Sequence, residues 1–443
     1  MKEDSTMEDP EIQGITKISV TGFKSLSSTC EIPVRRLTVL AGANCSGKSS
    51  IMQPMLMMKQ TLESPYDPGP LLLNGPNVRF TSAGQFFSNM GGNEYAKEMV
   101  VAIETDGSYY IKSIFSKGTS GPQLAKMEYG GDGKLFEFKN GMIVDSASYV
   151  IPAQLKELAE AFSKERKTTL SWQVQRDRCF FALALTENIE KTVRTVLSAA
   201  PLSPSFELQA RLRDIIHVPG LRGNPERTYP VTAIGGEFPG RFQDYVASII
   251  NMWQSEDNKR LQQLFNDLQV LGLTWKIEAH PLDDVQVELR VGRLVTARRG
   301  GAQDLVSIAD VGFGVSQTIP VLVALLAARK NQLVYIEEPE IHLHPNAQAA
   351  LAEIFLRAAS RGVRVVVETH SSLFLRKLQA LVAERPEYRR LVALHWFDRN
   401  KDGYTKVTSA ELDQTGAFGE WPSDFDEVSL RVEKEYINAG VRK

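Results

Sequence analysis

The stretch Gly42-Ala43-Asn44-Cys45-Ser46-Gly47-Lys48-Ser49 decides the fold class of this 443-residue chain. It has the spacing of a phosphate-binding loop, and its surroundings fit that interpretation. An apolar strand at residues 37–40 leads into the loop, and an apolar run at residues 50–62, expected to be helical, follows it. Pro54 lies inside this run and should kink the helix. The strand–loop–helix order predicts an α/β fold.

The same loop supplies residues expected to bind a nucleotide. Its glycines let consecutive backbone N–H groups point inward at a β-phosphate, and the following helix N-terminus adds a partial positive charge. Lys48 is expected to reach the β- and γ-phosphates of ATP, and Ser49 to ligate Mg²⁺. The expected ATP-binding residues of this segment are Gly42, Asn44, Ser46, Gly47, Lys48, Ser49 and Ser50.

The composition is ordinary for a globular chain, with 43% hydrophobic and 23% charged residues. No apolar run approaches the roughly 18 residues that a membrane helix needs, and residues 1–13 lack the basic and apolar parts of a signal peptide. Three cysteines, at positions 30, 45 and 179, offer neither a disulfide framework nor a CxxC site. These features favour a cytoplasmic protein with free thiols and no membrane partner.

The charge balance does not indicate nucleic acid as a partner. The formal net charge is −2, from 51 basic and 53 acidic residues, so the chain has no general basic character. Two local basic runs leave DNA contact open as an alternative to solvated faces. They contain Arg211, Arg213, Arg222 and Arg227, and later Arg290, Arg293, Arg298 and Arg299.

A second apolar strand, at residues 333–336, ends in two carboxylates, Glu337 and Glu338. An enzyme that hydrolyses a nucleoside triphosphate needs an acid near Mg²⁺ and a second group that orients the attacking water. Because successive strand residues point to opposite sides, the two glutamates are expected to divide these roles. We assign Glu337 to Mg²⁺, through water, and Glu338 to the attacking water.

Two histidines, His342 and His344, follow this strand directly. A His-x-His pair beside glutamates can be interpreted as a zinc site. The preferred interpretation is a loop beyond the acidic strand, in which His342 is structural and His344 faces the nucleotide of a neighbouring subunit.

A third apolar strand, at residues 364–367, is followed by His370. This strand is expected to lie beside the acidic one, where a side chain at its end can contact the γ-phosphate. We therefore predict that His370 is a γ-phosphate sensor.

A glycine-rich turn at residues 312–317 precedes an apolar helix at residues 318–328. A turn of this kind at a helix start is a second anion-binding element. Gly314, Ser316 and Gln317 are its candidate nucleotide contacts, and Pro320 is expected in the first turn of the helix.

The chain changes character between its two apolar halves, which predicts a core split by a long insertion. Residues 1–14 are expected to be a disordered tail, 15–75 and 301–395 the two parts of the core, and 396–443 a small C-terminal module. The inserted lobe, residues 76–300, is expected to carry short strands and then helices at 153–164, 188–198 and 240–271.

The order of these motifs resembles that of the ABC-type ATPases of the SMC, RecF and OLD group. Residues 18–25 are similar to the first strand of this group and its Asn-Phe-Lys-Ser turn, and residues 338–345 are similar to the OLD-type acidic block. Residues 314–317 match the signature region, although the serine that usually precedes its glycines is absent. Residues 218–222 and 421–425 resemble segments of ATPases from bacterial antiphage defence operons, such as the ATPase component of PARIS.

The resemblance implies an ABC-type P-loop ATPase core that uses ATP and Mg²⁺ and whose sites are completed by the signature helix of a second copy. It further implies a defence role, in which the chain controls a separate effector, such as a nuclease encoded nearby. The roughly 70 residues after position 372 are too few for the Toprim nuclease domain that OLD nucleases carry. Two alternatives remain: a RecF-like DNA repair ATPase and the ATPase subunit of a transporter.

Overall fold

The computed structural model describes residues 14–91, 94–106, 109–119, 121–131, 134–144, 151, 153–189, 192–198, 203, 205–296, 304–419, 434–435 and 438. The chain forms two compact units, unit 1 (Met1–Pro33 and Ser50–Ile215) and unit 2 (Val34–Ser49 and Ile216–Lys443). Each unit has sheets of its own. Residues 1–13 of the expected tail at 1–14, Arg298, Arg299 and the segment 421–425 lie outside the described residues.

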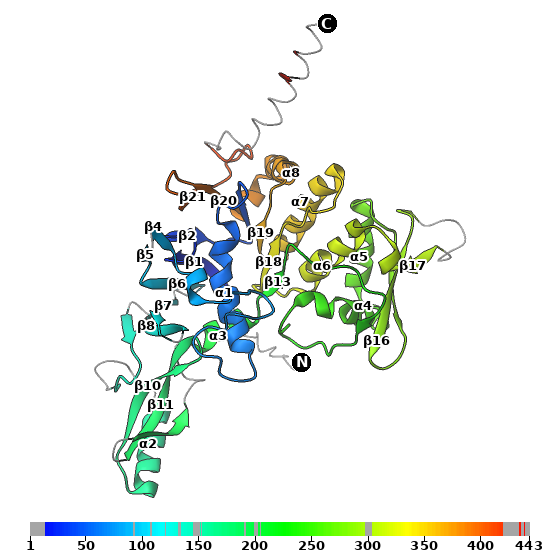
Figure 1. Cartoon of the computed structure of the whole chain (residues 1–443). Coiled ribbons are helices and arrows are strands. Elements are labelled where there is room, and N and C mark those ends of the chain that lie inside the picture. The colour runs from blue at the N-terminus through cyan, green and yellow to red at the C-terminus, as the bar shows by residue number, and fades with distance from the viewer. Residues whose placement is uncertain are drawn as a thin grey trace, which may run out of the picture. The chain divides into compact units, whose positions relative to one another are not determined.

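Unit 1 is built mainly on antiparallel strands (Figure 1). A six-stranded sheet has the order β2-β1-β6-β7-β8-β9, a three-stranded sheet has the order β10-β11-β12, and β4 pairs with β5. The strand bounds are β1 Ile15–Thr21, β2 Cys30–Pro33, β4 Asn89–Gly91, β5 Glu94–Tyr95, β6 Glu98–Thr105, β7 Tyr110–Gly118, β8 Gly121–Gly131, β9 Lys134–Phe138, β10 Leu170–Asp177, β11 Phe180–Ile189 and β12 Thr192–Ser198. Its helices are α2 Ala153–Arg166, α3 Phe206–Arg213 and most of α1 Lys48–Glu63.

Unit 2 is an α/β unit around a six-stranded sheet of order β13-β18-β19-β3-β20-β21. The first five strands run parallel, and β21 pairs antiparallel with β20. The bounds are β3 Leu37–Gly42, β13 Ile216–Val218, β18 Leu333–Glu337, β19 Arg364–Glu368, β20 Val392–Arg399 and β21 Thr405–Ala410. The central strands are buried along nearly their whole length, as expected where helices cover a parallel sheet.

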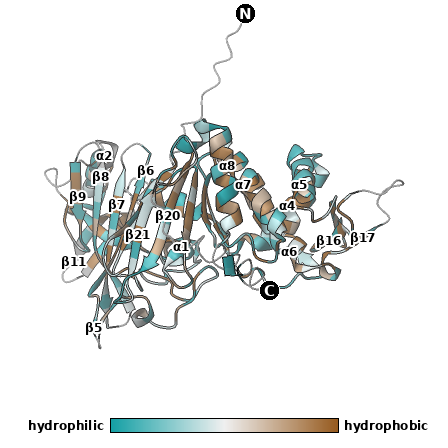
Figure 2. Cartoon of the chain, turned by 90° about the horizontal axis from the view of Figure 1, so that it is seen from above, coloured by the Kyte–Doolittle hydropathy of each residue, from teal (hydrophilic) through white to brown (hydrophobic). Residues whose placement is uncertain are grey.

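Helices complete the core of unit 2: α4 Val246–Ser255, α5 Lys259–Val270, α6 Phe313–Ala327, α7 Pro345–Ser360 and α8 Ser372–Glu384. Helix α7 packs against α8, α6 and the sheet, and its buried face carries Leu351 and Phe355. Figure 2 shows both hydrophobic and hydrophilic stretches on α7 and α8, which is typical of helices with one covered face. A smaller sheet of order β14-β16-β15, with β17 paired to β16, packs on α4; its strands are β14 Tyr229–Pro230, β15 Ile277–Pro281, β16 Gln286–Gly292 and β17 Leu305–Ser307.

The structure confirms the predicted α/β core but divides the chain differently from the expected boundaries. Strands β1 and β2, expected in the core, join one sheet with β6 to β9 in unit 1 instead, through the pairing of β1 with β6. Residues 216–296, expected in the inserted lobe, contribute β13, α4 and α5 to unit 2. Strands β20 and β21 join the core sheet, so residues 396–410 are not a separate module. Sheet pairing across long sequence separations decides these boundaries, and local patterns do not report it.

Two local predictions are wrong. Residues 188–198, expected to be helical, form the end of β11 and all of β12, because β-branched residues such as Val193 and Thr195 pair in a sheet more readily than they pack in a helix. Pro320 lies in the interior of α6, since that helix begins at Phe313, within the glycine-rich turn. Helix α1 runs continuously through Pro54. Among the described residues, no helix has both the length and the apolar character needed to cross a membrane.

Candidate active site

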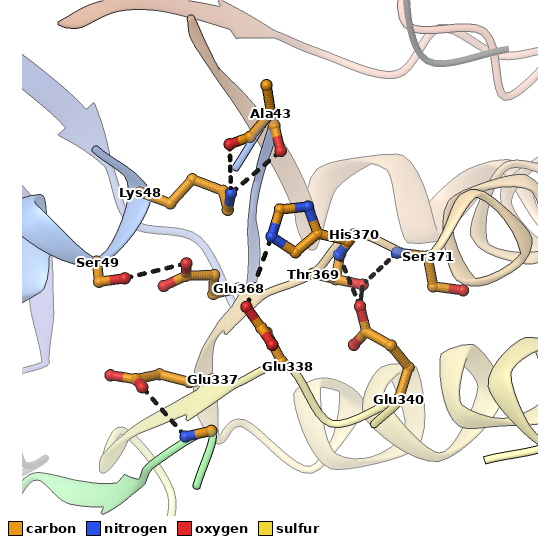
Figure 3. Close-up of polar contacts among 12 residues, drawn as sticks. Ala43, Lys48, Ser49, Glu337, Glu338, Glu340, Glu368, Thr369, His370 and Ser371 are labelled. Atoms are coloured by element: carbon orange, nitrogen blue, oxygen red, sulfur yellow. Dashed lines mark hydrogen bonds and ion pairs between the residues drawn. The ribbon is translucent and has the colours of Figure 1, made fainter. Parts of the chain in front are cut away.

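The candidate site lies in unit 2, at the edge of the sheet where the parallel strands end. The phosphate-binding loop follows β3, the two acidic residues close β18, and His370 lies two residues beyond β19. Because carboxyl ends of parallel strands meet at one edge, these three segments come together (Figure 3).

The loop after β3 wraps around the ammonium group of Lys48. Lys48 Nζ donates hydrogen bonds to the carbonyl oxygens of Gly42 (3.1 Å) and Ala43 (2.8 Å) (Figure 3). Only 3% of Lys48 is exposed, and burial lowers its pKa, while the charges of Glu368 and Glu338 act in the opposite direction.

The rest of this loop is held tightly. Gly42 has a φ of +143°, and a side chain there would approach Phe397 O to 2.1 Å. Thr405 Oγ1 donates to Ser46 O at 2.7 Å, whereas the buried Ser46 Oγ has no hydrogen-bond partner among the described residues. Asn44 is exposed, and Ser50, in the first turn of α1, is buried.

Ser49 meets a carboxylate that the sequence motifs did not indicate. Ser49 Oγ donates to Glu368 Oε1 at 3.0 Å (Figure 3). Tyr335 Oη donates to Glu368 Oε2 at 2.9 Å. Glu368 is 5% exposed. Burial and the neighbouring charge of Glu337 raise its pKa, and the bonds from Ser49 and Tyr335, with the charge of Lys48, oppose that rise.

Glu337 is held from the side of β13. Its Oε1 lies 3.2 Å from His217 Nε2, and its Oε2 accepts from the Gly220 amide at 3.1 Å. The His217 ring stacks on Tyr335 with centroids 5.3 Å apart. Burial alone would raise the pKa of Glu337, but His217 and the Gly220 amide keep it below its ordinary value.

Glu338 faces His370. Glu338 Oε1 lies 3.5 Å from His370 Nε2, and about a third of each side chain is exposed (Figure 3). The bond with His370 lowers the pKa of Glu338, so this carboxylate is anionic at neutral pH. The Glu338 amide donates to Glu368 O at 2.8 Å, and its φ of +43° costs on the order of 1 kcal/mol in a non-glycine residue. The backbone is thus held in a strained conformation that directs the carboxylate at His370.

Glu340 and Arg222 hold the backbone segments that carry Glu338 and His370. Glu340 Oε1 accepts from Thr369 Oγ1 (2.8 Å) and from the His370 amide (2.6 Å). Arg222 Nη2 donates to the carbonyl oxygens of Glu337 (2.6 Å) and Glu338 (3.3 Å). Burial lowers the pKa of Arg222 to about 10, and the charge of Glu340 is the largest opposing effect.

The signature candidates occupy the first turns of α6. Ser316 Oγ donates to Phe313 O at 3.2 Å, and Gln317 Nε2 donates to Gly223 O at 2.7 Å. Both side chains are buried inside this chain, so they do not point outward as a contact with a second copy would require. Phe313, the first residue of α6, is exposed at the N-terminus of that helix. Gly314 follows it, and a Cβ there would lie 3.2 Å from His342 O.

The two histidines after β18 have separate positions. The ring of His342 packs at an angle of 32° against that of Phe313, with centroids 5.6 Å apart, which agrees with a structural role. His344 is exposed and caps α7, since its Nδ1 accepts from the Asn346 amide at 3.4 Å. In the part of the chain that the structure describes, no three His, Cys, Asp or Glu residues gather as a metal cluster, so the zinc alternative has no support.

Three arginines of the basic runs are buried or paired with an acid. Arg222 is buried, Arg227 pairs with Asp310 (2.7 Å), and Arg290 pairs with Glu288 (2.8 Å). Neutralised in this way, these arginines offer little attraction to phosphates.

The donor set of the site fits Mg²⁺. Ser49 offers a hydroxyl and Glu368, which accepts its hydrogen bond, offers a carboxylate, and hard oxygen ligands are those that Mg²⁺ takes in proteins. The loop residues carry glycines at the positions where backbone must approach a phosphate, and the α1 N-terminus begins at Lys48.

Sequence reasoning placed Lys48, Ser49, Glu337, Glu338 and His370 in one site, and the structure brings them together. It missed residues that hold them: His217, Gly220, Tyr335, Glu340 and Glu368. Glu368 had a signal, since it is a carboxylate that closes a buried strand, as Glu337 does. Gly220 and Glu340 lie in segments with a family resemblance, but the contacts of all four could not be predicted, because their partners are distant in sequence.

Known proteins resemble this chain in part. Residues 134–376, more than half of the chain, match the family model described as "AAA domain, putative AbiEii toxin, Type IV TA system". The match begins after the phosphate-binding loop and includes β18, β19 and His370. The Old nuclease of Escherichia phage P2 is 23% identical over 380 residues, which cover 82% of this chain and 57% of that protein. The chain therefore spans little more than half the length of this relative.

Solved structures of SMC heads are also similar. One, an SMC head bound to the C-winged helix domain of ScpA, has a TM-score of 0.47 at 14% identity and covers 90% of this chain and 98% of that one. Another, an SMC head with an extended coiled coil bound to a ScpA domain from Pyrococcus furiosus, has a TM-score of 0.46 at 12% identity and covers 97% and 100%. At TM-scores below 0.5, these likenesses carry no detail of the site.

Proposed function

Because the chain belongs to the family of AAA domains described as putative AbiEii toxin, type IV TA system, we propose that it binds and hydrolyses ATP at the carboxyl edge of the unit 2 sheet. One observation carries the proposal: Lys48, Ser49, Glu338 and His370 converge there from three different strands (Figure 3). Such a set holds a triphosphate, orients water and responds to the γ-phosphate.

Each residue has a role in this proposal. The loop amides and Lys48 bind the β- and γ-phosphates, and the anionic Glu338 accepts a proton from the attacking water. His370, facing Glu338, donates to the γ-phosphate. Ser49 and the carboxylates at the ends of β18 and β19, of which the sequence indicates Glu337, would hold Mg²⁺. The ion supplies positive charge that neutralises the phosphate oxygens.

Glu338→Gln tests the proposal. The variant keeps the size of the side chain but loses the base, so ATP turnover should fall by roughly 10²- to 10⁴-fold while nucleotide binding is retained. Glu353→Gln, an exposed change on α7 with the same loss of charge, is the matched control and should turn over at the wild-type rate. Wild-type turnover by Glu338→Gln would remove Glu338 from the role of base.

We further propose that ATP binding joins two copies and that the pair controls a separate effector protein in defence against phage. The family description names a toxin and a type IV toxin–antitoxin system, and a relative is a phage nuclease, which supports a role of this kind. The exposed Phe313 and the α6 N-terminus are the surface proposed to meet the ATP of the second copy. Among the described residues Cys30, Cys45 and Cys179 form no disulfide, which supports a reducing compartment such as the cytoplasm.

A co-expressed neighbouring gene product tests the effector proposal. It should copurify with the wild-type chain, and the chain alone with ATP and Mg²⁺ should leave plasmid DNA and RNA intact. Cleavage by the chain alone that survives Glu338→Gln, but is lost on a substitution away from the ATP site, would contradict it.

A second candidate function, binding to DNA, is favoured by one feature. Lys259, Arg260, Arg357 and Arg361 line a cavity of about 240 Å³ between α5, α6 and α7, with Asp267 as the acid beside them. Burial and the neighbouring arginines lower the pKa of Arg361, as expected where like charges gather. Electrophoretic shifts at several salt concentrations test this candidate, since phosphate contacts weaken steeply with salt.

A further inference from the structure

The hydroxyl expected to ligate the metal makes its hydrogen bond to a carboxylate of an unexpected strand. In P-loop NTPases the serine after the loop lysine and one acidic residue hold Mg²⁺ together, so the acid beside that serine marks the metal position. Here Ser49 Oγ donates to Glu368 Oε1 at 3.0 Å, and Glu368 closes β19 (Figure 3). The acid beside the serine is therefore on β19 and not on β18, where Glu337 lies.

The sheet register explains how Glu368 reaches this position. Glu337 and Glu368 are direct partners on the parallel strands β18 and β19, so their side chains emerge on the same face. Tyr335, two residues before Glu337, lies on that face too, and its hydroxyl donates to Glu368 Oε2 at 2.9 Å. The bonds from Tyr335 and Ser49 fix both oxygens of Glu368.

Glu337 is engaged elsewhere. His217 Nε2 contacts its Oε1 at 3.2 Å, and the Gly220 amide donates to its Oε2 at 3.1 Å, so both oxygens face β13 and the loop after it. The two carboxylates from neighbouring strands therefore have different surroundings. Glu337 is bound to donors on the β13 side, and Glu368 meets the loop hydroxyl.

We propose that Glu368 is the carboxylate that positions Mg²⁺ with Ser49, and that Glu337 is a supporting residue anchored by His217. This inference rests on the proposed ATP site and refines its metal residues. The donor set, a hydroxyl and a carboxylate with only oxygen atoms, suits Mg²⁺. Ser49 directly follows Lys48 in the chain, so the proposed metal position lies beside the residue expected to bind the phosphates.

Metal dependence of nucleotide binding tests the inference without relying on turnover. A fluorescent ATP analogue is titrated into the full chain in EDTA and then at increasing Mg²⁺ concentrations. Glu368→Gln should bind the analogue in EDTA as the wild type does. The Mg²⁺ concentration that gives half of the Mg²⁺-dependent change in analogue affinity, the midpoint, should be at least tenfold higher than in the wild type. Glu337→Gln should shift this midpoint less than threefold, and the control Glu353→Gln should not shift it.

One further variant distinguishes a role in metal binding from a role in folding alone. Glu368→Asp keeps the charge but shortens the side chain, so it should shift the midpoint for Mg²⁺ more than the midpoint for the larger Mn²⁺. If Glu368→Gln does not fold, the comparison of Mg²⁺ and Mn²⁺ midpoints in Glu368→Asp takes its place as the test. A Glu368→Asp midpoint equal to that of the wild type for both ions would overturn the inference.

The outcomes separate this inference from the proposed function. A wild-type chain that binds no ATP analogue with Mg²⁺ would overturn both. A wild type that binds with Mg²⁺, together with a large midpoint shift in Glu337→Gln and none in Glu368→Gln, would overturn only the role of Glu368 and return the metal to Glu337.

Discussion

Glu340 should be essential to the site although it is not expected to touch the nucleotide. Its Oε1 accepts from Thr369 Oγ1 (2.8 Å) and from the His370 amide (2.6 Å), and its charge compensates the buried Arg222, which holds the carbonyl oxygens of Glu337 and Glu338. One carboxylate thus supports the segments that carry Glu338 and His370. The perturbation is Glu340→Gln, which keeps an acceptor oxygen and removes the charge.

The expected loss of stability follows from these contacts. Hydrogen bonds to an ionised acceptor are roughly twice as strong as neutral ones, so two weakened bonds cost about 2–3 kcal/mol. For a domain of this size about 1 kcal/mol shifts Tm by roughly 2–4 °C, which predicts a fall of roughly 5–10 °C. Loss of the compensating charge beside Arg222 adds to the effect in the same direction. Glu340→Ala should cost more, because the Thr369 hydroxyl and the His370 amide then lose their acceptor.

Thermal unfolding followed by circular dichroism, without nucleotide and at fixed pH and salt, measures this effect. ATP turnover is measured in parallel below the transition and should fall, since the position of His370 is no longer fixed. Glu353→Gln removes an exposed carboxylate from α7 and should keep both Tm and turnover. A Tm for Glu340→Gln within about 2 °C of the Glu353→Gln value would refute the reasoning, because it would mean that these bonds contribute little.

Further predictions concern the loop, the α6 N-terminus and the carboxylate on β18. Lys48→Ala should weaken ATP binding by roughly 10- to 100-fold in calorimetry, since a charged donor to the phosphates is lost; unchanged affinity would contradict its role. Gly42→Ala should abolish folding, as judged by circular dichroism, because its Cβ would lie 2.1 Å from Phe397 O. Gly314→Asp should abolish ATP-dependent dimerisation in light scattering through repulsion of the triphosphate, while the matched Gly314→Ala should retain most of it; equal dimerisation by both would exclude a trans contact there. The pKa of Glu337 is lower in the folded state than its ordinary value of 4.5, so its contribution to stability is complete above pH 4.5 and is lost as the pH falls through the lower value; His217→Asn should reduce this pH dependence of Tm.

Local motifs predicted much of the site. The glycine-rich loop after β3, the acidic residues that end β18 and the histidine after β19 each follow a buried strand directly, and strand order alone brings them to one edge. The central strands β3, β18 and β19 were also predicted, because each is a continuous apolar run.

The supporting residues could not be predicted in this way. His217 and Glu337 are 120 positions apart, and their contact depends on β13 pairing with β18, which no local pattern reports. The position of Glu368 beside Ser49 depends on the register of β18 and β19, and a shift by one residue would turn it to the other face. Ser316 and Gln317 were expected to contact a nucleotide, but both side chains are buried in the first turns of α6, which begins at Phe313.

The most direct measurement of the central claim is a structure of the Glu338→Gln chain with ATP and Mg²⁺. The account predicts the triphosphate within hydrogen-bond distance of Lys48 Nζ and the amides of residues 43–49, with the γ-phosphate beside His370. A triphosphate bound at another surface of the chain, or phosphates that do not contact Lys48 in a fully occupied complex, would contradict it.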